Sequence, residues 1–211
     1  MEATQQVKSR KRVADHGEVF TNEREVKAML DLVNDQCERI EATFLEPACG
    51  SGNFLIEILR RKLAILQNKY AKSPTEYNTN LIVAVSSIYG VELLQDNVLE
   101  CRERLFSEIE KSYPKKFKND NTFEQLMKSV NYILHQNIIC GDALTYTTHD
   151  GEPIVFIHWA MLPDGNVIQN FFDFKEISNV KQGMQSLFGE LQNDNPPPIM
   201  HYLKLGENDT K

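Results

Sequence analysis

A parallel α/β fold followed by an antiparallel hairpin is predicted from two features of the sequence. Between residues 20 and 144, segments with apolar residues at helical spacing alternate with short apolar runs, as in a parallel sheet whose strands are joined by helices. After Asp150 the chain becomes aromatic and rich in β-forming residues, and Asp164-Gly165 is a hairpin signal. The predicted organisation is a flexible polar arm over 1–15, an α/β domain over 16–150, a hairpin extension over 151–192 and a Pro-rich tail over 193–211.

The first half of the α/β domain predicts two helices and one strand around a glycine-rich turn. Residues 21–40 carry apolar side chains at helical spacing. Thr21, followed by two acids, suits the start of this helix because acids favour the positive end of the helix dipole. Residues 42–46 are predicted to be a short buried strand, and residues 53–71 an amphipathic helix with one apolar stripe.

The second half of the domain repeats the alternation after an expected loop. Residues 73–80 are expected to form this loop because Pro74 breaks regular structure. The elements expected after it are a helix end or strand over 81–85, a strand over 87–94, a helix over 95–117 that closes near Pro114, a helix over 121–136 and a strand over 137–144.

The hairpin extension and the tail differ from the α/β domain in composition. Residues 152–161 and 167–174 are aromatic runs that read as two strands joined by a short turn. Residues 193–205 contain three consecutive prolines after a short polar stretch. This composition excludes a regular helix or a central strand. We therefore expect an extended, docked or disordered segment there.

The composition, 41% hydrophobic and 25% charged, is that of an ordinary globular protein. The first twelve residues are polar, so they do not form a secretory signal. The most apolar stretch, residues 81–94, is too short and too polar to span a bilayer, which needs roughly 20 apolar residues. The four cysteines lack zinc-ligand spacing. We expect a cytoplasmic protein with reduced, largely buried thiols, no membrane contact and no metal.

The charge balance argues against a stand-alone nucleic-acid binder. The formal net charge is -7, whereas such proteins show a basic excess. Basic residues cluster only locally, in segments 8–12, 60–62 and 115–118. Each cluster could contact phosphate, but a solvated face is the favoured interpretation. Any contact with DNA is therefore expected to be made through a complex.

The stretch FLEPACGSGNF, residues 44–54, predicts a nucleotide-type site. An apolar strand ends in an acid, turns through Gly50 and Gly52, and enters a helix. Glycine allows positive φ and close approach of a ligand, and the N–H groups at the helix start can point toward it. A third glycine and a Lys-Ser/Thr pair are both absent, which excludes a dinucleotide fingerprint and a phosphate-binding P-loop. The alternative is a tight strand-to-helix turn without a ligand.

Two further acids close the next two predicted strands. Glu92 lies at a carboxyl strand end, where ligands bind in open α/β sheets, and could accept the hydroxyls of a ribose. Asp142 could accept a hydrogen bond from an exocyclic amine. The plainer interpretations are a solvated acid at a helix start for Glu92 and a turn-capping residue for Asp142. Three strand ends in order, each with a suitable group, favour a site over each plainer reading.

These segments together resemble the cofactor-binding part of adenine-N6 DNA methyltransferases of restriction-modification systems. FLEPACGSGNFL resembles the family's S-adenosylmethionine motif, and DHGEVFTNEREVKAML resembles the segment before it, usually G-x-x-F-T-P, with Asn22 in place of the proline. YGVELLQDNV and NIICGDAL resemble the second and third strands, so the likeness covers roughly residues 8–145. The resemblance implies a partial Rossmann-like S-adenosylmethionine-dependent methyltransferase fold, with the hairpin as a C-terminal extension.

The resemblance also implies a role for each matching residue. Phe20 and Thr21 would close over S-adenosylmethionine, and Asp142 would accept from its adenine amine. The ribose would be held by Glu92, with Leu93 packed on the adenine and Ala143 beside the ring. The remaining implied cofactor-binding residues, which form the motif itself, are Glu46, Pro47, Ala48, Gly50, Gly52, Asn53 and Phe54.

The family's catalytic element, Asn/Asp-Pro-Pro-Tyr/Phe, is not found in the sequence. The nearest letters, Asn195-Pro196-Pro197-Pro198, lack the aromatic residue and an apolar strand before them, so no catalytic residue is assigned. The first hypothesis is a cofactor-binding subunit or fragment that needs a second polypeptide for catalysis and target recognition. The alternative is a catalytically inactive, methyltransferase-like module for cofactor sensing or interaction, and a third, weaker one is an independent methyltransferase for RNA or a small molecule.

The aromatic residues of the hairpin admit two interpretations. They could form a surface on which bases stack, or they could be core and interface packing, which is the favoured interpretation. The residues concerned are Phe156, Trp159, Phe171, Phe172 and Phe174.

Overall fold

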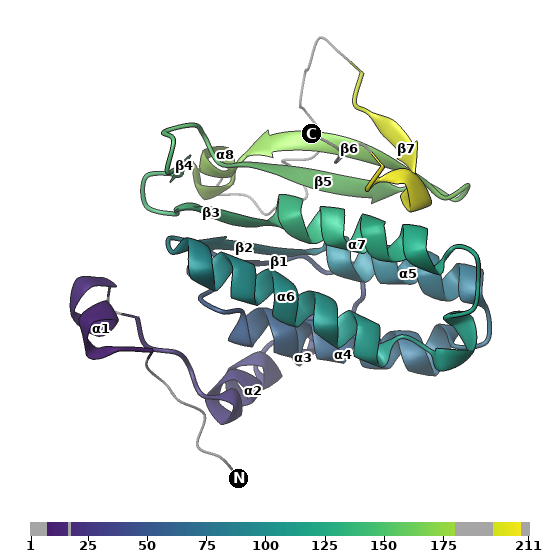
Figure 1. Ribbon diagram of the computed structural model, residues 1–211, viewed down its shortest axis with the longest axis horizontal. Coiled ribbons are helices and arrows are strands. Elements are labelled where there is room, and N and C mark those ends of the chain that lie inside the picture. The colour runs from purple at the N-terminus through teal and green to yellow at the C-terminus, as the bar shows by residue number, and fades with distance from the viewer. Residues whose placement is uncertain (1–7, 17, 180–195, 208–211) are drawn as a thin grey trace.

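Two β-sheets share one hydrophobic core in the computed structural model, which describes residues 8–16, 18–179 and 196–207 (Figure 1). The first sheet has four strands in the order β1-β2-β3-β4, and the second has three in the order β5-β6-β7. The predicted α/β fold with an antiparallel extension is confirmed. Across the described residues, no helix is long and apolar enough to cross a membrane.

The first sheet is built from three parallel strands and one short antiparallel strand. Its strands are β1 (Phe44–Glu46), β2 (Ile88–Glu92), β3 (Ile138–Asp142) and β4 (Thr147–Thr148). β2 lies between β1 and β3 and pairs in parallel with both, and all five of its residues are buried. Because the three parallel strands run the same way, their carboxyl ends meet at one edge of the sheet.

Four helices connect the parallel strands of this sheet. They are α4 (Asn53–Tyr70), α5 (Pro74–Ser86), α6 (Gln95–Ser112) and α7 (Phe123–Asn137), with the short η1 (Lys115–Phe117) between the last two. α4 contacts α6, and α6 contacts α7, so the three lie side by side (Figure 1). Gly90 of β2 faces this layer, since a Cβ built there would lie 3.0 Å from Leu55 of α4.

Two expectations for helices were wrong. Residues 74–86 form helix α5, where a loop was expected over 73–80. Ser73 caps this helix, accepting a bond from the Glu76 N–H, and Pro74 fits the first helical position because no N–H is needed there. The helix expected over 21–40 is two helices, α2 (Glu23–Asp31) and α3 (Asn34–Cys37), and it begins after Asn22.

The second sheet covers the opposite face of β2. It consists of β5 (Val155–Met161), β6 (Asn166–Asp173) and β7 (Ile199–His201), followed by η3 (Tyr202–Lys204). Tyr89 points to this side, since its ring lies 5.3 Å from that of Phe156 and its hydroxyl donates to the Ile157 carbonyl at 2.8 Å. The antiparallel pairing of β5 and β6 confirms the predicted hairpin, with Gly165 in its turn at a φ of 83°.

The structure distinguishes the two interpretations of the hairpin aromatics and shows which form the described part of the tail takes. Four of the five rings are buried, at 0 to 6% exposure, so they form core; Phe171 is 39% exposed. The described part of the tail is extended and docked, because β7 pairs with β6 as an edge strand of the second sheet. Helix α8 (Phe174–Asn179) follows β6, and Asn195 lies outside the described residues.

The polar segment at the N-terminus also contains regular structure. Residues 10–16 form helix α1 (Arg10–His16), which lies beside the start of α6 through side-chain contacts. Residues 8–16 and 18–22, called the N-terminal strap below, lead from α1 to the start of α2. The strap thereby passes the carboxyl ends of the parallel strands.

A buried lysine fixes the point where β1 begins. Lys62 of α4 is 0% exposed, and its Nζ donates to the carbonyls of Ile40 at 2.9 Å and Ala42 at 2.6 Å. It also donates to Ser87 Oγ, in the turn before β2, and lies 5.3 Å from the ring centre of Phe44. Burial lowers the pKa of Lys62 to about 7.

Candidate cofactor site

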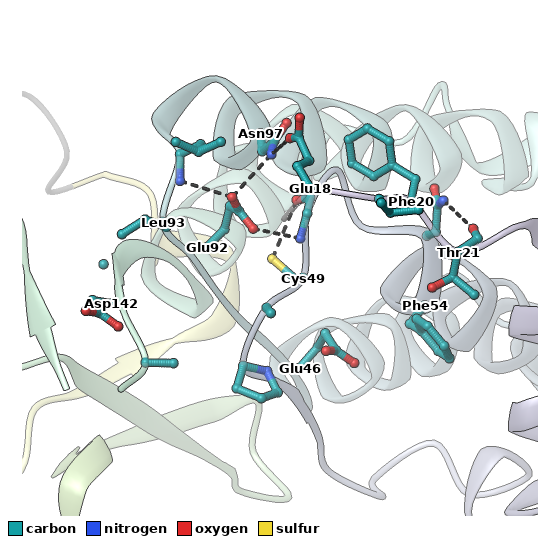
Figure 2. Close-up of a pocket in the computed structure, with 18 of the residues that line it drawn as sticks. Glu18, Phe20, Thr21, Glu46, Cys49, Phe54, Glu92, Leu93, Asn97 and Asp142 are labelled. Atoms are coloured by element: carbon teal, nitrogen blue, oxygen red, sulfur yellow. Dashed lines mark hydrogen bonds between the residues drawn. The ribbon is translucent and has the colours of Figure 1, made fainter. Parts of the chain in front are cut away.

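The carboxyl ends of the three parallel strands surround one pocket of about 570 Å³, a volume typical of small-molecule sites (Figure 2). Glu46, Glu92 and Asp142 are the last residues of β1, β2 and β3, and all three line it. The three acids that end the parallel strands therefore lie around one pocket.

Twelve of the thirteen residues expected at the site line this pocket. They are Phe20, Thr21, Glu46, Pro47, Ala48, Gly50, Asn53, Phe54, Glu92, Leu93, Asp142 and Ala143. Gly52 does not line it. Residues that the sequence reasoning missed also contribute to the wall, namely Glu18, Val19, Cys49, Leu94, Asn97, Gly141 and Leu144.

The two glycines of the turn serve different purposes. Both take positive φ, 53° at Gly50 and 88° at Gly52, where only glycine is free of strain. Gly50 lies on the pocket side, and a Cβ there would be 3.2 Å from the ring of Phe20. A Cβ at Gly52 would come within 2.5 Å of the Cys101 sulfur, so its glycine lets α6 pack closely against the turn. The need for Gly52 is structural.

Glu92 is held firmly at the floor of the pocket and is only 9% exposed. Its Oε1 accepts from the backbone N–H of Leu94 at 3.0 Å and from Asn97 Nδ2 at 3.2 Å. Its Oε2 accepts from the Gly50 N–H at 2.9 Å, which ties β2 to the glycine turn (Figure 2). Since a carboxylate oxygen has two lone pairs, Oε2 retains one acceptor site for a ligand.

Glu46 lies across the pocket with a less compensated charge. It is half-buried, and no salt bridge of the described residues includes it. Burial raises the pKa of Glu46, and a hydrogen bond with the backbone of Ala48 only partly offsets this effect. A cationic ligand group beside Glu46 would supply the missing countercharge.

The two carboxylate oxygens of Asp142 fit its two interpretations, as a turn-capping residue and as a hydrogen-bond acceptor for a ligand. Oδ1 accepts from the backbone N–H of Leu144 at 2.8 Å, which caps the turn after β3. Within the described residues no hydrogen bond is assigned to Oδ2, so that oxygen can accept from a ligand. Leu93 and Leu144 also line the pocket, and they are 41% and 89% exposed, so they add apolar surface to it.

The N-terminal strap forms the remaining wall of the pocket. Asn53, at the start of α4, donates to the Thr21 carbonyl at 2.9 Å, and Arg104 of α6 donates to Asn53 Oδ1 at 3.0 Å. Asn22, which stands where the resembled family has proline, caps α2 through a bond from the Arg24 N–H. These contacts hold Phe20 over the glycine turn.

Two functional residues escaped the sequence reasoning because their contacts are long-range. Asn97 is 1% exposed and donates to Glu92 and, at 2.6 Å, to Glu18 Oε1. Burial acts to raise the pKa of Glu18, but hydrogen bonds from Arg12 and Asn97, together with the charges of Arg12 and Lys8, outweigh it and lower the pKa. Glu18 could have been found from the sequence because it lies two residues before Phe20. No feature of the neighbouring sequence indicates Asn97.

The pocket as a whole is anionic. Its lining contains Glu18, Glu46, Glu92 and Asp142, and among the described residues no lysine, arginine or histidine contributes to it. Such a site repels phosphate groups, which in other nucleotide sites are met by lysine, arginine or unpaired N–H groups. It suits a ligand that carries positive charge, hydroxyl groups and an amine, together with an apolar or aromatic part for Phe20 and Leu93.

Comparison with known proteins agrees with this geometry. A comparison with curated proteins gave no match, and neither did one with solved structures. A family model described as "MmeI, DNA-methyltransferase domain" matches residues 17–161, which is more than half of the chain and includes every residue that lines the pocket. The chain therefore belongs to the MmeI DNA-methyltransferase domain family, a family of restriction-modification methyltransferases.

Proposed function

We propose that this chain is the S-adenosylmethionine-binding part of a DNA adenine-N6 methyltransferase. We further propose that a second polypeptide supplies the group that accepts hydrogen bonds from the target amine. The observation that carries the cofactor assignment is the anionic pocket at the ends of β1, β2 and β3. The adenine-N6 assignment is supported by the resemblance of residues 44–55 to the motif of those enzymes.

The charge of the pocket fits S-adenosylmethionine better than a phosphorylated nucleotide. The cofactor carries a sulfonium, an ammonium and one carboxylate group but no phosphate, so its net charge is positive. Four carboxylates line the pocket without a basic side chain from the described residues. In a partly desolvated site, each opposite charge attracts more strongly than in water, whereas a phosphate would be repelled. Glu46, whose carboxylate lacks a cation, is the proposed partner of the methionine ammonium group.

The other parts of the cofactor have matching groups in the pocket. The free acceptor site on Glu92 Oε2 suits a ribose hydroxyl, and Asp142 Oδ2 suits the exocyclic amine of adenine. Leu93 and Ala143, which follow these two acids in the chain, also line the pocket and offer an apolar surface for the base. Phe20 would cover the cofactor from the side of the N-terminal strap.

Methyl transfer in such a site depends mainly on alignment. S-adenosylmethionine supplies an already activated methyl group, so the protein need only place the target amine in line with it and exclude water. Glu46, Glu92 and Asp142 orient the cofactor from three strand ends, and Phe20 shields one side. The target amine still needs hydrogen-bond acceptors and a stacking partner for its base.

The proposal of a partner polypeptide is supported by the missing catalytic motif. The sequence contains no Asn/Asp-Pro-Pro-aromatic segment, and none of the described residues from 196 onward lines the pocket. Among the described strands, β1 pairs only with β2, so its other edge is available to an added strand close to Glu46. DNA would then be contacted through the complex, in keeping with the net charge of -7.

Methyl transfer from labelled S-adenosylmethionine to unmodified DNA tests this proposal. The chain would be assayed alone and after co-expression with the protein encoded beside it. We expect label in DNA only for the pair, and at the N6 position of adenine after digestion to nucleosides. Transfer by the chain alone contradicts the need for a partner. Cofactor binding without transfer in any pairing favours the alternative, an inactive cofactor-binding module.

A further inference from the structure

We propose that Asn97 is a positioning residue that couples the N-terminal strap to Glu92, so that the strap acts as a latch on bound cofactor. The inference rests on the proposed function, since it takes S-adenosylmethionine as the ligand of Glu92. It assigns a purpose to a group of charged residues outside the cofactor motif, on the strap and the first turn of α6.

Asn97 is a buried junction between three parts of the molecule. Its Nδ2 donates to Glu18 Oε1 at 2.6 Å and to Glu92 Oε1 at 3.2 Å, and its Oδ1 accepts from Lys8 Nζ at 2.7 Å. Both amide hydrogens and the carbonyl are therefore used, at a side chain that is 1% exposed. Two of these three partners belong to the strap, and the third is the proposed ribose ligand.

The strap is fastened to α6 by ion pairs around this junction. Arg12 donates from Nε to Glu18 Oε2 at 2.6 Å and from Nη2 to Asp96 Oδ1 at 3.1 Å, so it joins the strap to α6. Lys8 pairs with Glu100 Oε2 at 2.6 Å, one turn further along α6. The Glu18 side chain is only 8% exposed, and fork-like Arg–carboxylate contacts of this kind are among the stronger ion pairs.

The fastening reaches the pocket in two ways. Residues 18–21 line the pocket in succession, so a ligand seated against the strand ends is enclosed by the strap. In addition, Asn97 and the Leu94 N–H occupy Glu92 Oε1, which leaves Oε2 to face the ligand. Release of the strap removes two of the three partners of Asn97 and loosens its hold on Glu92.

This arrangement makes strap docking and cofactor binding mutually dependent. Because coupling free energy is reciprocal, a bound cofactor must stabilise the docked strap as much as the docked strap stabilises the cofactor. Cofactor dissociation then requires the ion pairs of Arg12 and Lys8 to open. Since these pairs are partly exposed, salt should speed their opening.

Dissociation of S-adenosylmethionine from the full chain, measured by stopped-flow competition, tests the latch. The variants are Arg12→Ala, Asn97→Ala and the double variant, with Arg10→Ala as the matched control, because Arg10 is exposed on the same helix without a charged partner among the described residues. We expect each single variant to dissociate about tenfold faster. The double variant should be no faster than the quicker single one, because both break one linkage.

Two further readouts separate a latch from a merely structural role. High salt should accelerate dissociation strongly from the wild-type chain and from Arg10→Ala, and less from Arg12→Ala, in which only the Lys8 ion pairs remain. Bound cofactor should slow trypsin cleavage after Lys11 in the wild-type chain. In Asn97→Ala, the cofactor should leave the rate of this cleavage unchanged. If Asn97→Ala does not unfold cooperatively, Arg12→Ala and its salt dependence decide the question.

The outcomes distinguish failure of the latch from failure of the cofactor assignment. Binding by the wild-type chain, with equal dissociation rates for Arg12→Ala and Arg10→Ala, overturns the latch alone. Additive effects in the double variant overturn the role of Asn97 as the link. No binding of S-adenosylmethionine by the wild-type chain overturns the proposed cofactor and the latch together.

Discussion

Replacement of Glu46 by glutamine tests whether the pocket selects its ligand by charge. The change keeps the size of the side chain and its ability to bond the Ala48 backbone, but removes the charge from a half-buried carboxyl that has no basic neighbour among the described residues. A hydrogen bond to an ionised group is worth about 1.4 kcal/mol more than a neutral one, which is about tenfold in affinity. We therefore expect cofactor affinity to fall about tenfold, as measured by calorimetric titration.

The stability of this variant should move the other way. Because burial raises the pKa of Glu46, the folded protein binds the proton more tightly than the unfolded chain does. The unfolding free energy therefore falls as the pH rises from the unfolded-state pKa to the folded-state pKa, and the full penalty applies at every higher pH. At neutral pH, Glu46→Gln should unfold at the same temperature as the wild type or at a higher one, so weaker binding cannot be attributed to damage.

The same carboxyl makes a specific prediction for the pH dependence of binding. A cationic ligand needs ionised Glu46, so affinity should be full above its raised pKa and lost as the pH falls through it. Glu46→Gln should lack this step. The control is Glu103→Gln, which removes an equal charge from an exposed position on α6. If Glu46→Gln and Glu103→Gln bind the cofactor equally well, the proposed role of Glu46 is wrong.

Three further substitutions test the surroundings of the pocket. Glu92→Ala strands the Gly50 and Leu94 N–H groups, so chemical denaturation should show a loss of about 3 kcal/mol in addition to weaker cofactor binding. Gly52→Ala should lower the free energy of unfolding by about 2 kcal/mol or more in the same assay, because it adds a clash with Cys101 to the strain of positive φ. Its control is Gly151→Ala, which has a φ of 82° and open space around it and should show the strain alone. For Lys62, the folded-state pKa of about 7 lies below its ordinary value of 10.5, so the unfolding free energy should rise by about 1.4 kcal/mol per pH unit between these two values. Lys62→Met should abolish this slope. An unchanged slope in Lys62→Met would exclude Lys62 as its source.

The order of helices and strands was largely predictable, because each parallel strand is a short apolar run that ends in an acid. The main error, the loop expected over 73–80, came from treating Pro74 as a breaker. Proline is also common in the first turn of a helix, and Ser73, which precedes it, caps the helix. The sequence of this segment fits both interpretations, and packing of α5 against α4 and α7 decides between them.

The site was predictable where its residues are consecutive and unpredictable where they come together through the fold. Residues of the glycine turn and of the three strand ends could be found from their order along the chain. The bond between Glu18 and Asn97 joins positions 79 residues apart, and neither residue type signals such a contact. The ion pairs of the strap likewise involve charges that, by sequence alone, resemble a solvated face.

The bonding of the glycine turn explains why this site suits a cation although the turn leads from a strand into a helix, as phosphate-binding loops do. In those loops the backbone N–H groups are free and point at an anion. Here the Gly50 N–H is already bonded to Glu92, so the positive end of that dipole is neutralised by a carboxylate of the protein itself. What remains exposed to the ligand is the unused acceptor of Glu92, with Glu46 and Asp142 beside it. At Gly50 the turn thus presents a carboxylate acceptor instead of an N–H donor, which favours a ligand that brings hydrogens and positive charge.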